Sequence, residues 1–353
     1  MSDKSEVILE ERGSLGLITL NKPQALNALS LSMVLAMEPK LHAWAADPAI
    51  STVVIQGAGD RAFCAGGDIR DLYDKRGTDF GATYYRAEYT QNVTIFNYPK
   101  PYIALMDGVV MGGGVGVSIH GSHRVVTERT LFAMPETGIG LFPDIGASWF
   151  LPRCPGEIGM YLGLTGYRMR AADCLYAGIG DVYIPSENLD GFIGALADAG
   201  PDSDGTDYDR VTRLLADFTG DPGPDKLSAH REEIDRCFAA ASVDEILDRL
   251  AAEDSDWARE TAGIIGAKSP TSLKVAFRQL RSAPALKRFE DAMLMEYRIA
   301  DRCYRGHDLF EGIRAVVIDK DGAPNWAPPD LASVSEADVD EYFVPADNEP
   351  DFG

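Results

Sequence analysis

Two acidic residues eight positions apart are the sequence's best candidates for acid–base or nucleophilic chemistry. Glu136 and Asp144 lie in the segment AMPETGIGLFPDIG, among proline, glycine and apolar neighbours. This composition indicates a shaped, partly buried turn, and burial near apolar groups raises the proton affinity of a carboxylate. Such a group can act as a general base or as a nucleophile. Spacing alone leaves a second interpretation open, in which both side chains only cap turns or helices.

Two loops of small residues offer backbone N–H groups as a further chemical element. FCAGGDI (residues 63–69) follows a predicted strand at Thr52–Gln56, and MDGVVMGGGVG (residues 106–116) follows one at Tyr102–Met106. Residues without bulky side chains let the backbone approach a ligand closely, and two converging N–H groups can form an oxyanion hole. Alternatively, the glycines serve only tight turns and close packing. The second loop lacks the spacing of a dinucleotide-binding GxGxxG motif.

Several other reactive residue types are better explained by structure. His120 and His123 lie three positions apart, but no third metal ligand follows at a suitable spacing. Ser118 has no GxSxG turn around it, which argues against a serine nucleophile. Cys64 has no neighbour that would activate a thiol, so packing is its expected role.

Composition narrows the class of protein. The chain has 353 residues, 45% of them hydrophobic, and a formal net charge of −22, which disfavours binding to nucleic acid or to a membrane surface. The five cysteines are scattered without a CxxC pair, so neither a disulfide framework nor a zinc site is expected. The first residues resemble neither a secretory signal nor a transit peptide, and we expect a cytoplasmic protein.

Elements that could position these residues follow from the hydrophobic pattern. Strands are predicted at Val7–Leu9, Leu15–Leu20, Thr52–Gln56, Tyr102–Met106, Arg124–Thr127 and Leu131–Ala133, with a helix over Ser30–Ala46. Short strands alternating with helices indicate an α/β core of repeated β-β-α units. Beyond Tyr161 helical periodicity dominates, with a polar linker at Asp198–Asp209 and amphipathic helices within residues 242–257 and 271–302.

The three segments, in this order and spacing, resemble the crotonase (enoyl-CoA hydratase/isomerase) superfamily. Within it, the segments MGGGVGVSIHG, LFAMPETGIGLFPDIG with FLPR, SPTSLK and EGIRAVVIDKD resemble the 3-hydroxyisobutyryl-CoA hydrolases. The resemblance runs from about Val7 to Phe343. It implies a crotonase-like spiral of β-β-α units in residues 1–200 with the active site, a mostly helical region in 201–330 and an acidic tail in 331–353.

The resemblance assigns roles residue by residue. The backbone N–H groups of Gly67 and Gly113 would hold the thioester oxygen. Glu136 would be the nucleophile or the general base, and Asp144 would bind the substrate's 3-hydroxyl or orient the reacting group. Glu88, in TYYRAEYTQN, would contact substrate, although a solvated helix face is the alternative.

The resemblance also implies which residues bind coenzyme A. The adenine and pantetheine parts would contact Ala25 of NKPQALNAL together with Ala65, Asp68 and Ile69 of FCAGGDI. Coenzyme A would therefore belong to the substrate, and neither a metal nor a redox cofactor is needed.

Two positions distinguish between the reactions that the resemblance allows. Hydratases of the superfamily carry a glutamate where this chain has Gly116, and a glycine where it has Asp144. This pattern favours a thioester hydrolase, acting on 3-hydroxyisobutyryl-CoA in valine catabolism. The alternatives are an enoyl-CoA hydratase or isomerase and a catalytically silent acyl-CoA-binding protein. The exact acyl group stays open, as does a homo-oligomeric state.

Overall fold

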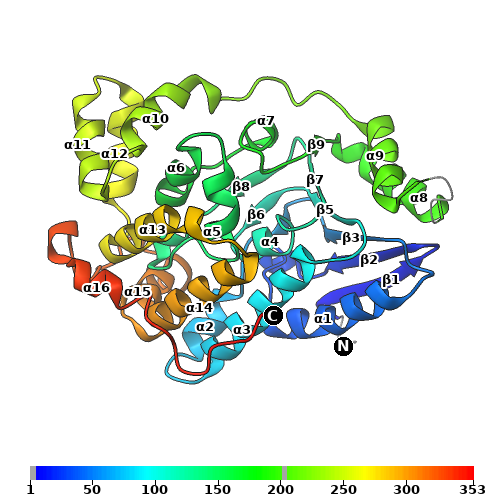
Figure 1. Ribbon diagram of the computed structural model, residues 1–353, viewed down its shortest axis with the longest axis horizontal. Helices are drawn as coiled ribbons and strands as arrows, with labels where there is room; N and C mark the ends of the chain where they lie inside the picture. The colour runs from blue at the N-terminus through cyan, green and yellow to red at the C-terminus, as the bar shows by residue number, and fades with distance from the viewer. Residues whose placement is uncertain (1–4, 201–204) are drawn as a thin grey trace. The chain divides into compact units, whose positions relative to one another are not determined.

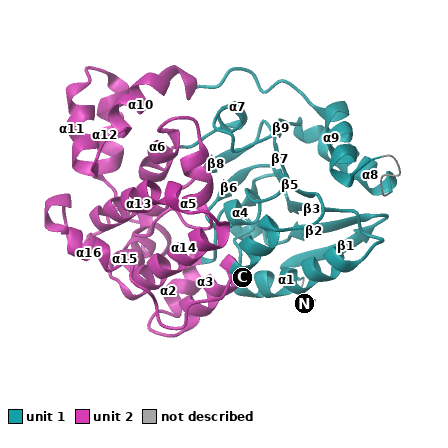
Figure 2. Ribbon diagram, in the orientation of Figure 1, with its two compact units in different colours: residues 1–68, 90–132, 168–226 teal, residues 69–89, 133–167, 227–353 magenta. Residues whose placement is uncertain are grey.

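The computed structural model describes residues 5–200 and 205–353, so part of the predicted linker at Asp198–Asp209 lies outside the described residues. The chain divides into two compact units that alternate along the sequence (Figure 2). Unit 1 comprises residues 1–68, 90–132 and 168–226, and unit 2 comprises residues 69–89, 133–167 and 227–353. The predicted boundaries near residues 200 and 330 stay predictions.

Unit 1 is built on a six-stranded sheet with the order β1-β2-β3-β5-β7-β9 (Figure 1). The first two strands are antiparallel and joined at Gly13-Ser14, and the following pairs are parallel. The strands are β1 (Val7–Arg12), β2 (Leu15–Leu20), β3 (Thr52–Gly57), β5 (Tyr102–Met106), β7 (His123–Val126) and β9 (Val182–Tyr183). The short strand β9 was not predicted, since two residues give no periodicity to detect.

A second, three-stranded sheet has the order β4-β6-β8. Its strands are β4 (Ala62–Cys64), β6 (Val109–Met111) and β8 (Leu131–Ala133). Each follows a strand of the larger sheet in sequence, so after β1 and β2, which both lie in the larger sheet, the next three strand pairs contribute one strand to each sheet. The predicted α/β core of repeated β-β-α units is confirmed.

Helices cover the larger sheet, whose strands β2, β3 and β5 are mostly apolar and buried. Buried side chains from β2, β3, β5 and β7 form one hydrophobic cluster with α8 (Leu189–Asp198) and α9 (Asp207–Phe218). Helix α1 (Leu31–Ala46) is capped by Ser30, whose hydroxyl accepts a hydrogen bond from the N–H of Met33, and it packs against β1 and β2. The remaining helices that begin in unit 1 are α4 (Gly113–Gly116) and α7 (Ala171–Tyr176).

Unit 2 is helical apart from the end of β8. Its helices are α2 (Ile69–Asp74), α3 (Phe80–Phe96, whose last residues belong to unit 1), α5 (Ala147–Phe150), α6 (Ile158–Thr165), α10 (Arg231–Phe238), α11 (Val243–Ala252), α12 (Asp256–Gly266), α13 (Pro270–Ser282), α14 (Phe289–Arg305), α15 (Asp308–Ile313) and α16 (Glu336–Asp340). All regular elements within residues 205–353 are helices, which confirms the predicted helical character of this region.

Two predicted helical stretches are each divided in the structure. The stretch 242–257 contains α11 and the start of α12, because Ser255 caps a new helix by accepting from the N–H of Ala258. The stretch 271–302 contains α13 and most of α14, separated by a short 3-10 helix with Pro284. A polar cap and a proline interrupt the backbone ladder without interrupting the hydrophobic pattern.

Candidate functional site

Three carboxylates predicted from the sequence are buried in unit 2. The side chains of Glu88, Glu136 and Asp144 are only 3%, 3% and 4% exposed. An isolated ionised carboxylate is costly to bury, so such groups hold protons more tightly than usual or accept hydrogen bonds. The pKa of each of the three is raised, and Glu88 and Asp144 also accept a hydrogen bond from a tyrosine hydroxyl.

Glu136 begins a 3-10 helix over Glu136–Ile139 that follows Pro135. The carbonyl of Thr137 accepts from the N–H of Ser269, the first residue of the SPTSLK segment, at 3.1 Å. The backbone of Ile139 lies so close to Gly312, in EGIRAVVIDKD, that a Cβ there would approach it to 2.4 Å. Both C-terminal segments that carry the resemblance therefore support the turn that holds Glu136.

Burial raises the pKa of Glu136 well above its ordinary value, and the nearby charge of Asp144 raises it further. Lys268 acts in the opposite direction. The Oε2 atom of Glu136 is buried and has no hydrogen-bond partner among the described residues. Because a buried polar atom is normally satisfied, this oxygen is available to a substrate or a water molecule.

Asp144 lies at the start of an unusual turn. The two residues after it have positive φ angles, 54° at Ile145 and 90° at Gly146. The hydroxyl of Tyr89 donates to Oδ2 of Asp144 at 2.8 Å. Burial raises the pKa of Asp144 to about 7, although the Tyr89 hydrogen bond lowers it. Near neutral pH this group can therefore exchange a proton.

Glu88 lies on α3, one residue before Tyr89, and accepts a hydrogen bond from the Tyr84 hydroxyl at 3.3 Å. Burial raises its pKa well above the ordinary value, and the charge of Asp144 adds to this. The alternative interpretation of Glu88 as part of a solvated helix face is wrong. The electrostatic coupling places Glu88 and Asp144 in one buried cluster.

Sequence reasoning missed two residues of this cluster. Tyr85 is 2% exposed, and its buried hydroxyl has no hydrogen-bond partner in the described part of the chain. Its pKa is raised well above the ordinary value by burial first and then by the charge of Asp144. Glu296 of α14 is 0% exposed, with a pKa raised by burial to about 8. The three tyrosines of TYYRAEY were the available sequence signal for Tyr85. Nothing near Glu296 in the sequence indicates that it belongs to the site.

The two loops of small residues lie side by side in unit 1. They follow β4 and β6, which are parallel neighbours. A Cβ on Gly114 would lie 2.3 Å from the carbonyl oxygen of Cys64, so only glycine permits this approach. The backbone N–H groups of Gly67 and Gly113 donate to no acceptor within residues 5–200 or 205–353. The structure thus brings the predicted pair of backbone donors onto adjacent loops.

The residues expected to contact coenzyme A are also partly brought together. The N–H of Ala65 donates to the carbonyl of Leu26, directly after Ala25, at 3.0 Å. Asp68 forms an ion pair of 2.8 Å with Lys22. These contacts lie within unit 1, while Ile69 begins α2 in unit 2. Binding of coenzyme A by these residues stays a prediction.

The residues assigned to packing have structural partners. The Ser118 hydroxyl donates to the carbonyls of Gly114 and Val115. The ring of His120 packs edge-on against Phe96, and Cys64 is buried. Within the described residues, no group of three or more His, Cys, Asp or Glu side chains could hold a metal ion. No described helix is both long and apolar enough to cross a membrane.

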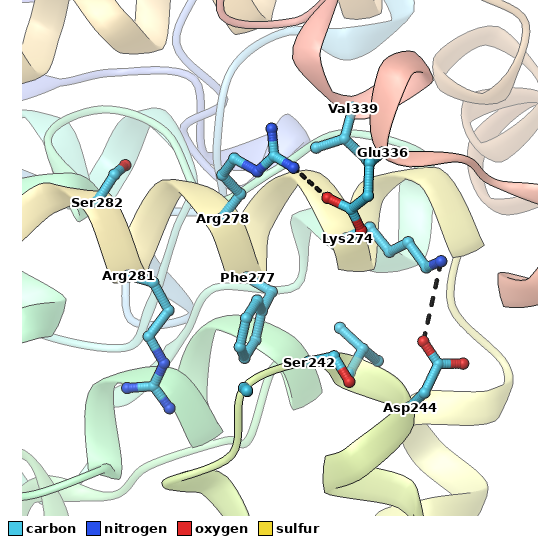
Figure 3. A pocket seen from close by; sticks show the side chains of 11 residues that line it. Ser242, Asp244, Lys274, Phe277, Arg278, Arg281, Ser282, Glu336 and Val339 are labelled. Atoms are coloured by element: carbon cyan, nitrogen blue, oxygen red, sulfur yellow. Dashed lines mark hydrogen bonds and ion pairs between the residues drawn. The ribbon is translucent and has the colours of Figure 1, made fainter.

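A surface pocket of about 320 Å³ lies elsewhere in unit 2, along α13 (Figure 3). Its basic side chains are already paired, Lys274 with Asp244 and Arg278 with Glu336. None of the predicted site residues lines it. The buried carboxylates, and not this pocket, remain the candidate active site.

Comparison with known proteins shows the family to which the chain belongs. Residues 15–343 match the family model described as enoyl-CoA hydratase/isomerase. The chain belongs to this family, and the predicted crotonase-like fold is thereby confirmed.

Two groups of relatives carry different names. The chain is 44% identical to a mitochondrial 3-hydroxyisobutyryl-CoA hydrolase of Danio rerio, covering 98% of this chain and 92% of that protein. It is 42% identical to that of Homo sapiens, covering 96% and 88%. Among solved structures, it resembles a carnitinyl-CoA dehydratase from Mycobacterium thermoresistibile at 39% identity, with a TM-score of 0.91 and 99% of each chain covered. An enoyl-CoA hydratase from Rhodobacter sphaeroides has 38% identity and a TM-score of 0.88, with 97% and 98% covered.

Proposed function

We propose that this chain hydrolyses a short-chain acyl-CoA thioester, with 3-hydroxyisobutyryl-CoA as the preferred substrate. Water is consumed, the carbon–sulfur bond breaks, and 3-hydroxyisobutyrate and free coenzyme A are released, as a step of valine breakdown requires. The observation that carries the proposal is the buried pair Glu136 and Asp144, both with raised pKa. The names of the vertebrate relatives support the same reaction.

Glu136 is the reacting group in this proposal. Its carboxylate either attacks the thioester carbonyl to form a mixed anhydride, which water then cleaves, or removes a proton from the attacking water. Its unpartnered Oε2 supports either role. The backbone N–H groups of Gly67 and Gly113 stabilise the tetrahedral oxyanion, as the family resemblance implies. Asp144 binds the 3-hydroxyl or orients the reacting group.

This chemistry needs no metal or redox cofactor, because backbone N–H groups supply the polarisation and a carboxylate supplies the base or nucleophile. Coenzyme A enters as part of the substrate. The acyl pocket has to distinguish acyl groups that differ by one methyl. One methyl in a pocket typically changes the free energy of discrimination between two substrates by only about 1–3 kcal/mol. Slower hydrolysis of 3-hydroxypropionyl-CoA is therefore part of the proposal.

Hydration of an enoyl-CoA is the second candidate, since two similar solved structures carry dehydratase and hydratase names. Gly116 argues against hydration. This position is a buried glycine of α4, so one of the two carboxylates of a two-glutamate hydration is missing there. The test incubates the protein with 3-hydroxyisobutyryl-CoA and with crotonyl-CoA, following free thiol and enoyl absorbance. Thiol release from the first ester is expected, and loss of enoyl absorbance without thiol release would contradict the proposal.

A further inference from the structure

Two buried side chains from α13 and α14 hold the turn around Asp144 from both of its ends. Gln279 and Glu296 are each 0% exposed. The Nε2 group of Gln279 donates to the carbonyl of Pro143, the residue before Asp144, at 2.7 Å. After Asp144, the Glu296 carboxylate accepts from the N–H of Gly146 at 2.7 Å and of Ser148 at 2.8 Å.

The turn needs such support because its own backbone conformation is unfavourable. A positive φ at a β-branched residue such as Ile145 is rare and costs conformational energy. Gly146, with a φ of 90°, has to donate its N–H outside the turn. An external acceptor that satisfies the N–H groups of both Gly146 and Ser148 selects this conformation over its relaxed alternatives.

The two supporting side chains also belong to one network. Nε2 of Gln279 donates to the Ser148 hydroxyl at 2.8 Å and lies 3.5 Å from Oε1 of Glu296. Burial raises the pKa of Glu296, while its hydrogen bonds from Ser148 and Gly146 lower it. Burying this carboxylate costs more free energy than burying an apolar side chain would. Its hydrogen bonds go to the backbone of the turn that follows Asp144.

From this geometry we propose that Glu296 and Gln279 are positioning residues, which act on the reaction by fixing the location of the Asp144 carboxylate. The inference rests on the proposed hydrolase function, in which Asp144 contacts the substrate. Neither side chain is needed to touch the substrate. Their effect on turnover should therefore exist only while Asp144 itself is functional.

A double-mutant cycle tests this dependence. Kinetic constants for 3-hydroxyisobutyryl-CoA are measured for Glu296→Gln, Gln279→Met and Asp144→Asn, and for each of the first two combined with Asp144→Asn. Displacing a reacting group by about 1 Å typically costs on the order of 100-fold, so each single positioning variant should lose 10- to 100-fold in kcat/KM. In the Asp144→Asn background, the same changes should cause less than about a twofold further loss.

Asp173 provides a matched control, because it is a buried carboxylate that also accepts two backbone N–H groups, those of Lys226 and Arg170. Asp173→Asn should lower the melting temperature as Glu296→Gln does, with a loss of activity that is small and unaltered by Asp144→Asn.

Three results would overturn the inference: full activity in folded positioning variants, losses that multiply with that of Asp144→Asn, or failure of both variants to fold while Asp173→Asn folds. Absence of thiol release by the unmodified protein would instead reject the hydrolase proposal itself.

Discussion

The hydroxyl of Tyr89 donates to Oδ2 of Asp144 across 2.8 Å, between two side chains that are both buried. Tyr89 is 0% exposed, so this hydrogen bond lies away from bulk water. A hydrogen bond to a charged group contributes about 1.5–3 kcal/mol, which corresponds to roughly one or two pKa units. The proton affinity of Asp144 therefore depends directly on this contact.

Tyr89→Phe should raise the pKa of Asp144 above its value of about 7. The acidic limb of kcat/KM against pH, which reports ionisations of the free enzyme, should move upward by about one pH unit or more. Tyr102→Phe is the matched control, since the buried Tyr102 hydroxyl donates to the carbonyl of Val117 in unit 1. A limb that stays in place in Tyr89→Phe would contradict the assignment.

The buried carboxylates also predict how stability changes with pH. Glu88, Asp144 and Glu296 all have raised pKa values in the folded chain. Each keeps its proton in the folded state at pH values where the unfolded chain has lost it. The stability that these protons contribute to the folded state is fully present below about pH 4. It is lost as the pH rises through the folded pKa, and the free energy of unfolding falls by up to about 1.4 kcal/mol per pH unit for each group.

Glu88→Gln replaces one of these titrating groups with a side chain that does not titrate. The variant should gain unfolding free energy relative to the unmodified protein at pH 7 and show little difference at pH 4, while losing activity. Urea unfolding at several pH values measures this. Glu187→Gln on an exposed position is the control. An equal stability difference at both pH values would show that the Glu88 pKa is not raised.

The unpartnered hydroxyl of Tyr85 suggests a contact that forms only with substrate. Tyr85→Phe should leave the melting temperature unchanged or raise it, because the fold loses a buried group that has no partner within the described residues. The KM for 3-hydroxyisobutyryl-CoA should rise several-fold. A lower melting temperature with unchanged KM would instead assign the hydroxyl to the fold.

Gly114 tests the close approach of the two loops in unit 1. Gly114→Ala would place a Cβ 2.3 Å from the Cys64 carbonyl oxygen, and we expect a loss of about 1–3 kcal/mol in stability from overpacking together with reduced kcat. Gly194→Ala, where a Cβ meets nothing within 4 Å, should be neutral or stabilise α8 by up to about 1 kcal/mol. Equal stability of the two variants would contradict the tight packing of the loops.

The sequence was sufficient for features that depend on local pattern. Strands β1, β2, β3, β5 and β7 of the larger sheet and helix α1 follow from their hydrophobic periodicity, whereas the two-residue strand β9 does not. The glycine-rich loops and the carboxylates Glu136 and Asp144 were singled out as candidates by residue type and spacing, whereas the roles proposed for them came from the family resemblance. The division of residues 242–257 between two helices was missed, because a serine cap leaves the apolar spacing intact.

Contacts between distant segments could not be predicted in this way. Gly146 and Glu296 are 150 residues apart in the chain, and the sequence around Glu296 resembles any amphipathic helix. The burial of Glu88 likewise depends on elements that pack around α3 and not on its neighbours in sequence. The residues that set the environment of the reacting groups are therefore those that required the structure.

Release of free thiol from 3-hydroxyisobutyryl-CoA by the unmodified protein and by Glu136→Gln tests the central claim most directly. The substitution keeps the size of the side chain and removes its ability to act as nucleophile or base. We predict turnover by the unmodified protein. In the variant, the rate of thiol release should fall by about 100- to 10,000-fold, with the melting temperature retained. Comparable thiol release by both proteins would contradict the assignment of Glu136 as the reacting group.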